Sequence, residues 1–174
     1  AYGSLESPLG KGFTIKAGLR YEYTSSDLGS EEQQGIVDRQ FGELFPSLYL
    51  SKQFSEHYSV STSYSKRITR PTFNDMAPFV LFLDPYTFFS GNPALQPAIA
   101  HKIGLGINLK TVILNFDYTT EDSTIAQYQS SLIPGTNKQL LFAENMKSTH
   151  TFFGSIAIPI TPVKWWNMQY NLMA

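Results

Sequence analysis

The chain has 174 residues, a formal net charge of -1 and no cysteine. The balanced charge and the lack of a basic run argue against nucleic-acid binding, and the missing thiols exclude a disulfide framework or a thiolate metal site. Charged residues make up 16% of the chain, below the roughly 25% of soluble domains, but no apolar run approaches the roughly 18 residues of a membrane-spanning helix.

Strong alternation of apolar and polar residues begins after residues 1–7, which we interpret as the tail of an earlier strand. The apolar positions of residues 13–24 all have odd numbers: Phe13, Ile15, Ala17, Leu19, Tyr21 and Tyr23. Because side chains alternate between the two faces of a β-strand, this segment predicts a strand with one apolar face. It exceeds the usual strand length of about 5–6 residues and matches the roughly 9–11 residues of a tilted strand that crosses a bilayer.

The same alternation predicts further strands at residues 44–54, 58–68, 99–109, 112–121, 139–160 and 165–173. Pro46 cannot donate a backbone hydrogen bond, so we expect it at a bulge or an unpaired edge position. The face opposite the apolar residues carries serines, glycines and few charges. These small polar residues cannot form a dry core and are typical of a crowded or water-filled barrel lumen. Tyrosines and tryptophans at several strand ends fit the two membrane interfaces.

The connections between these strands alternate in length. Short links lie at residues 8–12, 55–57, 110–111 and 161–164, and long ones at residues 25–40, 69–98 and 122–138. Outer-membrane barrels have short periplasmic turns at one rim and long extracellular loops at the other. The sequence therefore predicts an all-β fold, an antiparallel transmembrane β-barrel segment with about 7–8 up-and-down strands of a larger barrel.

The first and last predicted strands are shorter than a bilayer crossing. Seven residues at about 3.3 Å each do not span the membrane at a tilt. The chain also ends in Leu172-Met173-Ala174, without the terminal aromatic residue common in outer-membrane barrels. We therefore expect residues 1–174 to be part of one outer-membrane β-barrel domain, with the plug and the remaining strands absent from this sequence.

Several motifs follow one another in a characteristic order. They are Leu44-Phe45-Pro46-Ser47-Leu48-Tyr49-Leu50, Tyr64-Ser65-Lys66-Arg67-Ile68-Thr69-Arg70-Pro71, Pro78-Phe79, Asp84-Pro85-Tyr86, Gly91-Asn92-Pro93-Ala94-Leu95-Gln96-Pro97 and Glu144-Asn145. This series resembles the late barrel of TonB-dependent receptors, in particular the outer-membrane β-barrel family that is abundant in Bacteroidetes. The resemblance spans most of the chain.

The resemblance implies a bacterial outer-membrane protein with a barrel of about 22 strands and an N-terminal plug. Such a receptor imports a scarce ligand of the siderophore, cobalamin or glycan type and receives energy from TonB through the plug. The implied partners are outer-membrane lipid, TonB, an unknown small-molecule or glycan ligand and, in some arrangements, a surface lipoprotein. This sequence contains no plug and no TonB box, so energised transport rests on the resemblance alone.

The connection at residues 69–98 is the candidate ligand-binding segment. Loops of about 30 residues are usually functional or disordered, and its phenylalanines argue against disorder. The candidate ligand-binding residues in and beside it are Arg67, Arg70, Asp75, Phe79, Asp84 and Tyr86. The arginines can bind a carboxylate or phosphate at two points, but they can also pin the loop through Arg–Asp pairs or contact lipopolysaccharide phosphates. The aromatic residues can likewise simply pack the loop against its neighbours.

No catalytic or metal-binding arrangement emerges from the sequence. His57, His101 and His150 lie far apart and lack the spacing of metal ligands, and neither an acid–base pair nor a Ser-His-Asp arrangement can be placed. We therefore predict no enzymatic activity, no metal and no cofactor. Two other interpretations stay open, a soluble lipocalin-like binding module and a plain porin or structural outer-membrane barrel. The lipocalin-like fold would turn these apolar residues inward: Phe13, Ile15, Leu19, Ile103 and Ile107.

Overall fold

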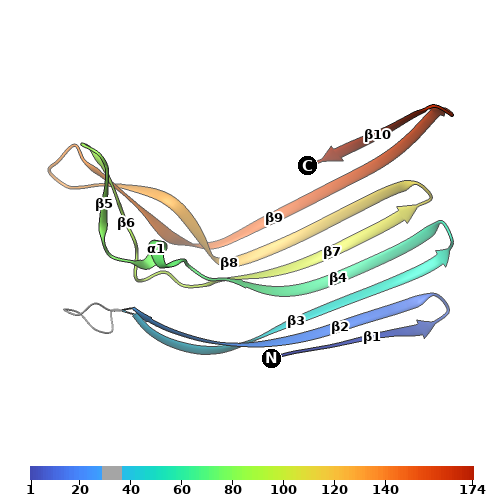
Figure 1. The fold of residues 1–174 in the computed structure, drawn as a ribbon, viewed down its shortest axis with the longest axis horizontal. Coiled ribbons are helices and arrows are strands. Elements are labelled where there is room, and N and C mark those ends of the chain that lie inside the picture. The colour runs from blue at the N-terminus through green and yellow to red at the C-terminus, as the bar shows by residue number, and fades with distance from the viewer. Residues whose placement is uncertain (29–36) are drawn as a thin grey trace.

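The computed structural model describes residues 1–28 and 37–174. Their strands form one curved ten-stranded sheet (Figure 1). The strands are β1 (Tyr2–Gly10), β2 (Phe13–Leu28), β3 (Val37–Ser55), β4 (Tyr58–Thr69), β5 (Val80–Asp84), β6 (Thr87–Ser90), β7 (Ala98–Leu109), β8 (Val112–Leu132), β9 (Gln139–Val163) and β10 (Trp166–Met173), and a short helix α1 spans Phe73–Met76. Among the described residues, no helix is long and apolar enough to cross a membrane.

Eight long strands form an antiparallel meander in the order β1-β2-β3-β4-β7-β8-β9-β10. The sheet is open, because no ladder between β1 and β10 is present among the described residues. Short turns connect the strands at one end, and the long connection between β4 and β7 lies at the other end (Figure 1). The predicted all-β, antiparallel up-and-down architecture is confirmed.

The strands extend further at the long-loop end than the sequence pattern predicts. β2 reaches Leu28, β3 begins at Val37 and β8 continues to Leu132, so most of the expected loop at residues 122–138 is strand. Of the expected loop at residues 25–40, the central residues 29–36 lie outside the described part. The ladder between β8 and β9 runs from Ile113 to Leu132, because backbone pairing continues where the side chains no longer alternate in polarity.

The register sorts the side chains into an apolar face and a polar face. One cross-strand row joins Ile15, Leu50, Thr62, Leu105 and Phe116. The adjacent row joins Thr14, Ser51, Ser61, Gly106 and Asn115. Large apolar side chains stay exposed, with Ile103 at 53% and Phe152 at 76% of their full exposure. The sheet is therefore a wall between two environments, one apolar and one polar, rather than the cover of a core.

Burial is concentrated at the long-loop end. The apolar side chains that are buried within the described part are Phe45, Ala77, Leu95, Ala98 and Ala143. All but Phe45 belong to the connection between β4 and β7 or to the strands that it contacts. The only tightly packed apolar cluster of the described chain thus lies where this long connection folds back onto the sheet.

Pro46 marks the place where β3 and β4 separate. The ladder between these strands ends at the pair Ser47 and Ser65, whereas β3 continues to pair with β2 through Leu19 and Pro46. The absent N–H of Pro46 fits this unpaired edge, as the sequence predicts. Lys66 forms an ion pair with Glu43 across the gap.

The loop between β4 and β7, residues 70–97, carries α1 and the β5–β6 hairpin. Thr72 caps α1 in a capping box with Asp75. β6 then pairs in parallel with the start of β9, from Thr87 with Gln139 to Phe89 with Leu141. Because β9 lies two strands beyond β7 in the sheet, the 70–97 loop reaches past β8 to the far edge of β9 (Figure 1).

Two asparagines attach the returning part of this loop to β9. The side-chain nitrogen of Asn92 donates to the carbonyl of Ala143 at 3.0 Å. The side chain of Asn145 accepts from the Gln96 N–H at 2.6 Å and donates to the Gln96 carbonyl at 2.9 Å. Leu95, between these two attachments in the chain, is fully buried. The loop is therefore held by hydrogen bonds on both sides of a buried apolar residue.

Gly91 permits the close approach of two loop segments. Its N–H donates to the Ala77 carbonyl at 3.1 Å, and any Cβ at this position would overlap the backbone of Ala77. A backbone cannot move aside as a flexible side chain can, so the position requires glycine for reasons of space.

We predict that Gly91→Ala releases the 70–97 loop from β9 without unfolding the sheet. Limited proteolysis of the full-length protein in outer-membrane vesicles should then cut within residues 78–90, which stay protected in the unaltered protein. The matched control is Gly154→Ala, whose added Cβ would meet Phe116 at an ordinary contact distance of 3.7 Å. Equal protection of both variants would contradict the packing role of Gly91.

Candidate functional site

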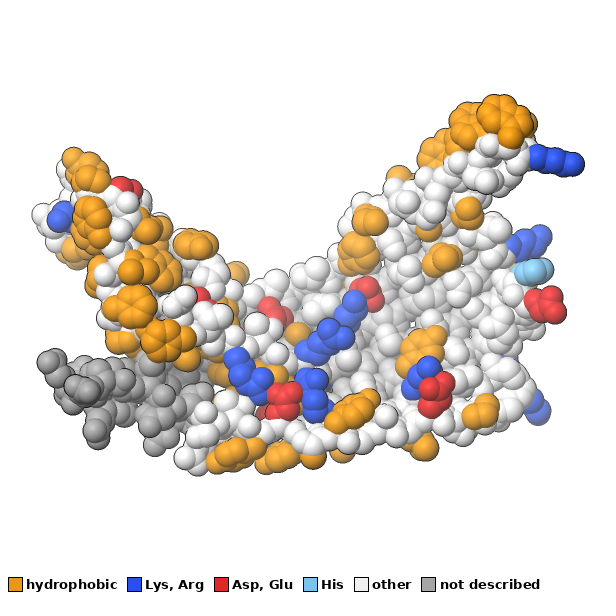
Figure 2. All heavy atoms as spheres, in the orientation of Figure 1, with side chains coloured by type: hydrophobic (Ala, Val, Ile, Leu, Met, Phe, Trp, Pro, Cys, Tyr) orange, Lys and Arg blue, Asp and Glu red, His pale blue; other side chains and the backbone are white. Residues whose placement is uncertain are grey.

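A groove of about 660 Å³ opens between the 70–97 loop and β8. It is lined by Thr72, Asn74, Asp75, Phe79, Leu81, Leu83, Phe89, Gln127 and Tyr128. Five of these side chains are aromatic or aliphatic, and Phe79, Leu81, Leu83 and Tyr128 are more than a third exposed. Apolar side chains gather on this arm of the molecule in Figure 2. A groove with apolar walls and a few polar groups is typical of a ligand-binding surface.

Tyr128 enters the groove through an irregularity in β8. The register between β8 and β9 shifts between Ala126 and Gln129, and Tyr128 has a positive φ of 56°. A β-bulge of this kind re-aims a side chain, and here the tyrosine ring lies 6.2 Å from the ring of Phe89. Sequence reasoning missed Tyr128 because it placed this residue in a loop; its only sequence signal is an aromatic residue among polar ones.

Asp75 is a buried link between the loop and β8. One carboxylate oxygen accepts from the Thr72 N–H at 2.8 Å and from its hydroxyl at 2.7 Å, and the other accepts from the Gln127 amide at 2.9 Å. Burial opposes ionisation of Asp75, but these hydrogen bonds outweigh it and lower its pKa below the usual value. Its acceptor sites are thus used in holding α1 against β8.

Asp84 and Tyr86 lie in the turn of the β5–β6 hairpin, outside the groove lining. The Asp84 carboxylate accepts from the Tyr86 N–H at 2.8 Å, and this bond, aided by the Thr87 hydroxyl, lowers the pKa of Asp84. Tyr86 is 62% exposed. Asp84 therefore shapes the turn, and Tyr86 stands at its surface.

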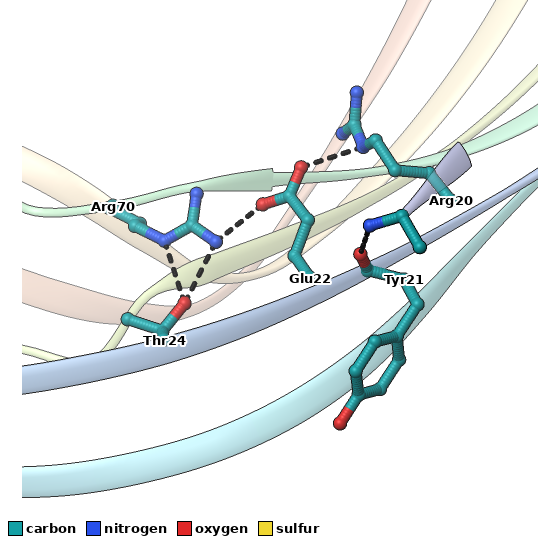
Figure 3. A network of polar contacts seen from close by, with 6 residues as sticks. Arg20, Tyr21, Glu22, Thr24 and Arg70 are labelled. Atoms are coloured by element: carbon teal, nitrogen blue, oxygen red, sulfur yellow. Dashed lines mark hydrogen bonds and ion pairs between the residues drawn. The ribbon is translucent and has the colours of Figure 1, made fainter.

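Arg70 is tied to β2 rather than to an aspartate of its own loop (Figure 3). Its guanidinium donates to Glu22 at 2.5 Å and to the Thr24 hydroxyl at 2.9 Å. The second oxygen of Glu22 pairs with Arg20 at 2.6 Å. The Arg–Asp pairing considered from the sequence is not formed by Arg70. Instead, Glu22, which the sequence did not single out, fixes the start of the loop to the opposite part of the sheet.

Arg67 lies in a separate hollow of about 540 Å³ on the polar face. Two ion pairs also border this hollow, Lys16 with Glu6 at 3.0 Å and Lys102 with Asp117 at 2.9 Å. Within the described part of the chain, Arg67 has no carboxylate at ion-pair distance. Figure 2 shows charged side chains gathered in the hollowed middle of the sheet.

The structure thus divides the six candidate residues among four places. Asp75 and Phe79 share the groove, Arg67 lines the hollow, and Arg70 joins the network on β2. Asp84 and Tyr86 form the hairpin turn. Across residues 1–28 and 37–174, no group of three or more histidine, aspartate or glutamate side chains is arranged to hold a metal ion.

We predict that acid releases the loop through Asp75. Because its folded-state pKa lies below the unfolded value of about 3.9, its contribution to docking is complete above that value and is lost as the pH falls through the folded pKa. Pepsin digestion of the full-length protein should therefore show a protected loop near pH 5 and a cleaved one at the lowest pH.

Two variants check this assignment to Asp75. Asp75→Asn should be cleaved readily even at the higher pH, because one amide cannot supply both carboxylate acceptors. Glu56→Gln, in the turn at the opposite end of the sheet, should keep the pH dependence of the unaltered protein. A loop whose protection is independent of pH would refute the role of this carboxylate.

Solved structures share this arrangement of strands. The siderophore receptor PirA from Pseudomonas aeruginosa is 16% identical, with a TM-score of 0.65 over 99% of this chain and 34% of that one. The hemophore receptor HasR from Serratia marcescens is 17% identical, with a TM-score of 0.68 over 91% of this chain and 31% of that one. The ferric enterobactin receptor PfeA from Pseudomonas aeruginosa is 14% identical, with a TM-score of 0.62 over 99% and 26% of the two chains.

These similarities concern the fold, and this chain spans between 26% and 34% of the length of those three receptors. No relative was found among the curated protein sequences. The outer membrane protein beta-barrel family matches the chain from residue 1 to residue 174. This match supports the outer-membrane interpretation and disfavours the lipocalin-like one, and the apolar face is the lipid-facing one. The chain belongs to the outer membrane protein beta-barrel family and resides in the bacterial outer membrane.

Proposed function

We propose that this chain is the barrel portion of a TonB-dependent receptor that imports a scarce ligand of the siderophore, cobalamin or glycan type. The observation that carries the proposal is the 70–97 loop, which is fastened across β8 to β9 and presents an apolar groove at the long-loop end. A passive pore needs a polar, water-filled path, whereas exposed apolar side chains in a groove retain a ligand. A plug and its contact with TonB belong to this proposal by family resemblance.

The solved relatives support a receptor rather than a plain porin or a structural barrel. They are a siderophore receptor, a hemophore receptor in complex with its hemophore and heme, and a ferric enterobactin receptor. The groove and the hollow of this chain offer two kinds of contact to a ligand, apolar walls and an arginine without a carboxylate partner among the described residues.

The candidate residues divide into ligand contacts and supports. We assign Phe79 to the ligand, because it lines the groove and is 41% exposed. Arg67 is assigned to an acidic group of the ligand, since guanidinium binds carboxylate or phosphate at two points. Arg70, Asp75 and Asp84 have partners that fix the loop. Tyr86 is left as a contact at the outer edge of the hairpin.

We predict that Phe79→Ser combined with Tyr128→Ser weakens ligand binding by at least about tenfold, which corresponds to roughly 1.4 kcal/mol. The probes are a ferric catecholate siderophore, heme, cyanocobalamin and an oligosaccharide, each titrated calorimetrically into the full-length receptor. The control is Phe82→Ser with Leu132→Ser, since both side chains are more than 60% exposed and neither lines the groove. Affinities that are the same in both double variants would end the assignment of the groove.

Arg67 and Arg70 should differ in what they change. Arg67→Gln should weaken the binding of acidic probes by about tenfold and leave the binding of neutral cyanocobalamin unchanged, because one charged contact is lost. Arg70→Gln should release the start of the loop from β2 and weaken every probe that binds. The same titrations measure both variants, and equal losses for acidic and neutral probes in Arg67→Gln would contradict a direct contact.

A further inference from the structure

The apolar face changes its chemistry at one cross-strand row. Starting near the short turns, the rows across β4, β7, β8 and β9 are mostly apolar up to the row of Tyr64, Ile103, Tyr118 and Phe152. The next row consists of Lys66, His101, Thr120 and His150. In an outer-membrane barrel an apolar band of about 25 Å is flanked by aromatic girdles at both interfaces. This polar row therefore borders the lipid-facing band on the side of the long extracellular loops.

Both histidines of this row are held by a tyrosine in the same way. The hydroxyl of Tyr64 lies 2.9 Å from Nδ1 of His101, and the hydroxyl of Tyr118 lies 3.0 Å from Nδ1 of His150. When a tyrosine hydroxyl donates to Nδ1, the ring proton is on Nε2. No partner for either Nε2 occurs among the described residues. Each pair thus orients an imidazole, and with the tyrosine hydroxyl as the donor, the Nε2–H of that imidazole is left as an uncommitted donor.

The spacing of the two donors suits a headgroup rather than a single small ion. β7 and β9 are separated by β8, which places the two backbones about 10 Å apart. The hydroxyl of Thr120 stands between them in the row. Lys66 at the end of the row is committed to Glu43, and the next position of this face on β8 is Asp122, paired with Ser148. The Asp122 carboxylate repels an anion, so a bound anion would lie beside His101 and His150 rather than one row further out.

From this geometry we propose that His101, Thr120 and His150 form a binding site for a phosphorylated lipid headgroup of the outer leaflet. The occupant is a lipid because the site continues the lipid-facing apolar band. In the adjacent row of that band, the ring centroids of Tyr118 and Phe152 lie 4.5 Å apart. The recognised group is a phosphate because the site offers N–H and O–H donors to an acceptor-rich anion. The site lies on the opposite side of the wall from the hollow that contains Arg67 and does not depend on the imported ligand.

The test uses the full-length protein in detergent, with lipid A carrying both phosphates, the same lipid A after removal of its phosphates, and inorganic phosphate alone as probes. The unaltered protein should bind the phosphorylated lipid at least about tenfold more tightly than the dephosphorylated one, and inorganic phosphate should not compete at equal concentration. His101→Phe with His150→Phe keeps the aromatic rings but removes the donors, and should abolish this preference. His57→Phe, in the short turn at the other end of the sheet, should leave it intact.

A second double variant distinguishes loss of the histidine donors from a defect in folding. Tyr64→Phe with Tyr118→Phe keeps the rings but removes the hydroxyls that orient the imidazoles, and should reduce the preference for phosphate to an intermediate value. Equal binding of both forms of lipid A to the unaltered protein would overturn the proposal and leave an ordinary aromatic girdle. The same holds if the double histidine variant retains the full preference, and competition by inorganic phosphate would show an anion site that does not recognise lipid.

Discussion

The backbone pairing that joins each strand to the next, from β1 to β10, is the constraint on which the rest of this structure depends. In hydrocarbon every backbone N–H and C=O must find a partner within the protein, and in a β-structure only strands that are paired on both sides provide one. Because side chains alternate with a period of two, one fixed register decides for all strands at once which residues face lipid and which face the lumen. The serine and glycine rows opposite the leucine and isoleucine rows follow from that register. A slip of one residue would turn Lys102 and Asp117 into the membrane.

The long-loop end is organised by a different kind of contact. There the apolar face has ended, and the structure relies on side chains that bind backbone groups, as Asn92 and Asn145 do. These bonds close over Leu95 and give the 70–97 loop its fixed position. The groove is a consequence of that position, since one wall belongs to the loop and the other to β8. Rigid docking of a long loop is thus what creates a binding surface on an otherwise plain wall.

The sequence predicted the strands of the sheet better than the residues of the groove. Alternation located the strands because each residue there reports its own environment, lipid or lumen. Alternation did not predict the part of β8 after residue 121. Both faces of the strand are polar there, and Asp122 and Gln127 are not part of an alternating pattern. The contacts that build the site join residues about fifty positions apart, such as Glu22 with Arg70 and Gln96 with Asn145. No local pattern encodes such pairs, and a bulge that re-aims Tyr128 is equally invisible before the register is known.

The parallel pairing of β6 with β9 has a consequence for the height of the wall. One edge of β9 carries β10 beside residues 155–163, whereas the far part of the same edge carries β6 beside residues 139–141. Any strand that continues along this edge from β10 runs toward β6 and meets it head-on. The loop thereby occupies the edge of β9 that a longer β10 would reach, and beyond this point β9 is paired with β8 and with the β5–β6 hairpin.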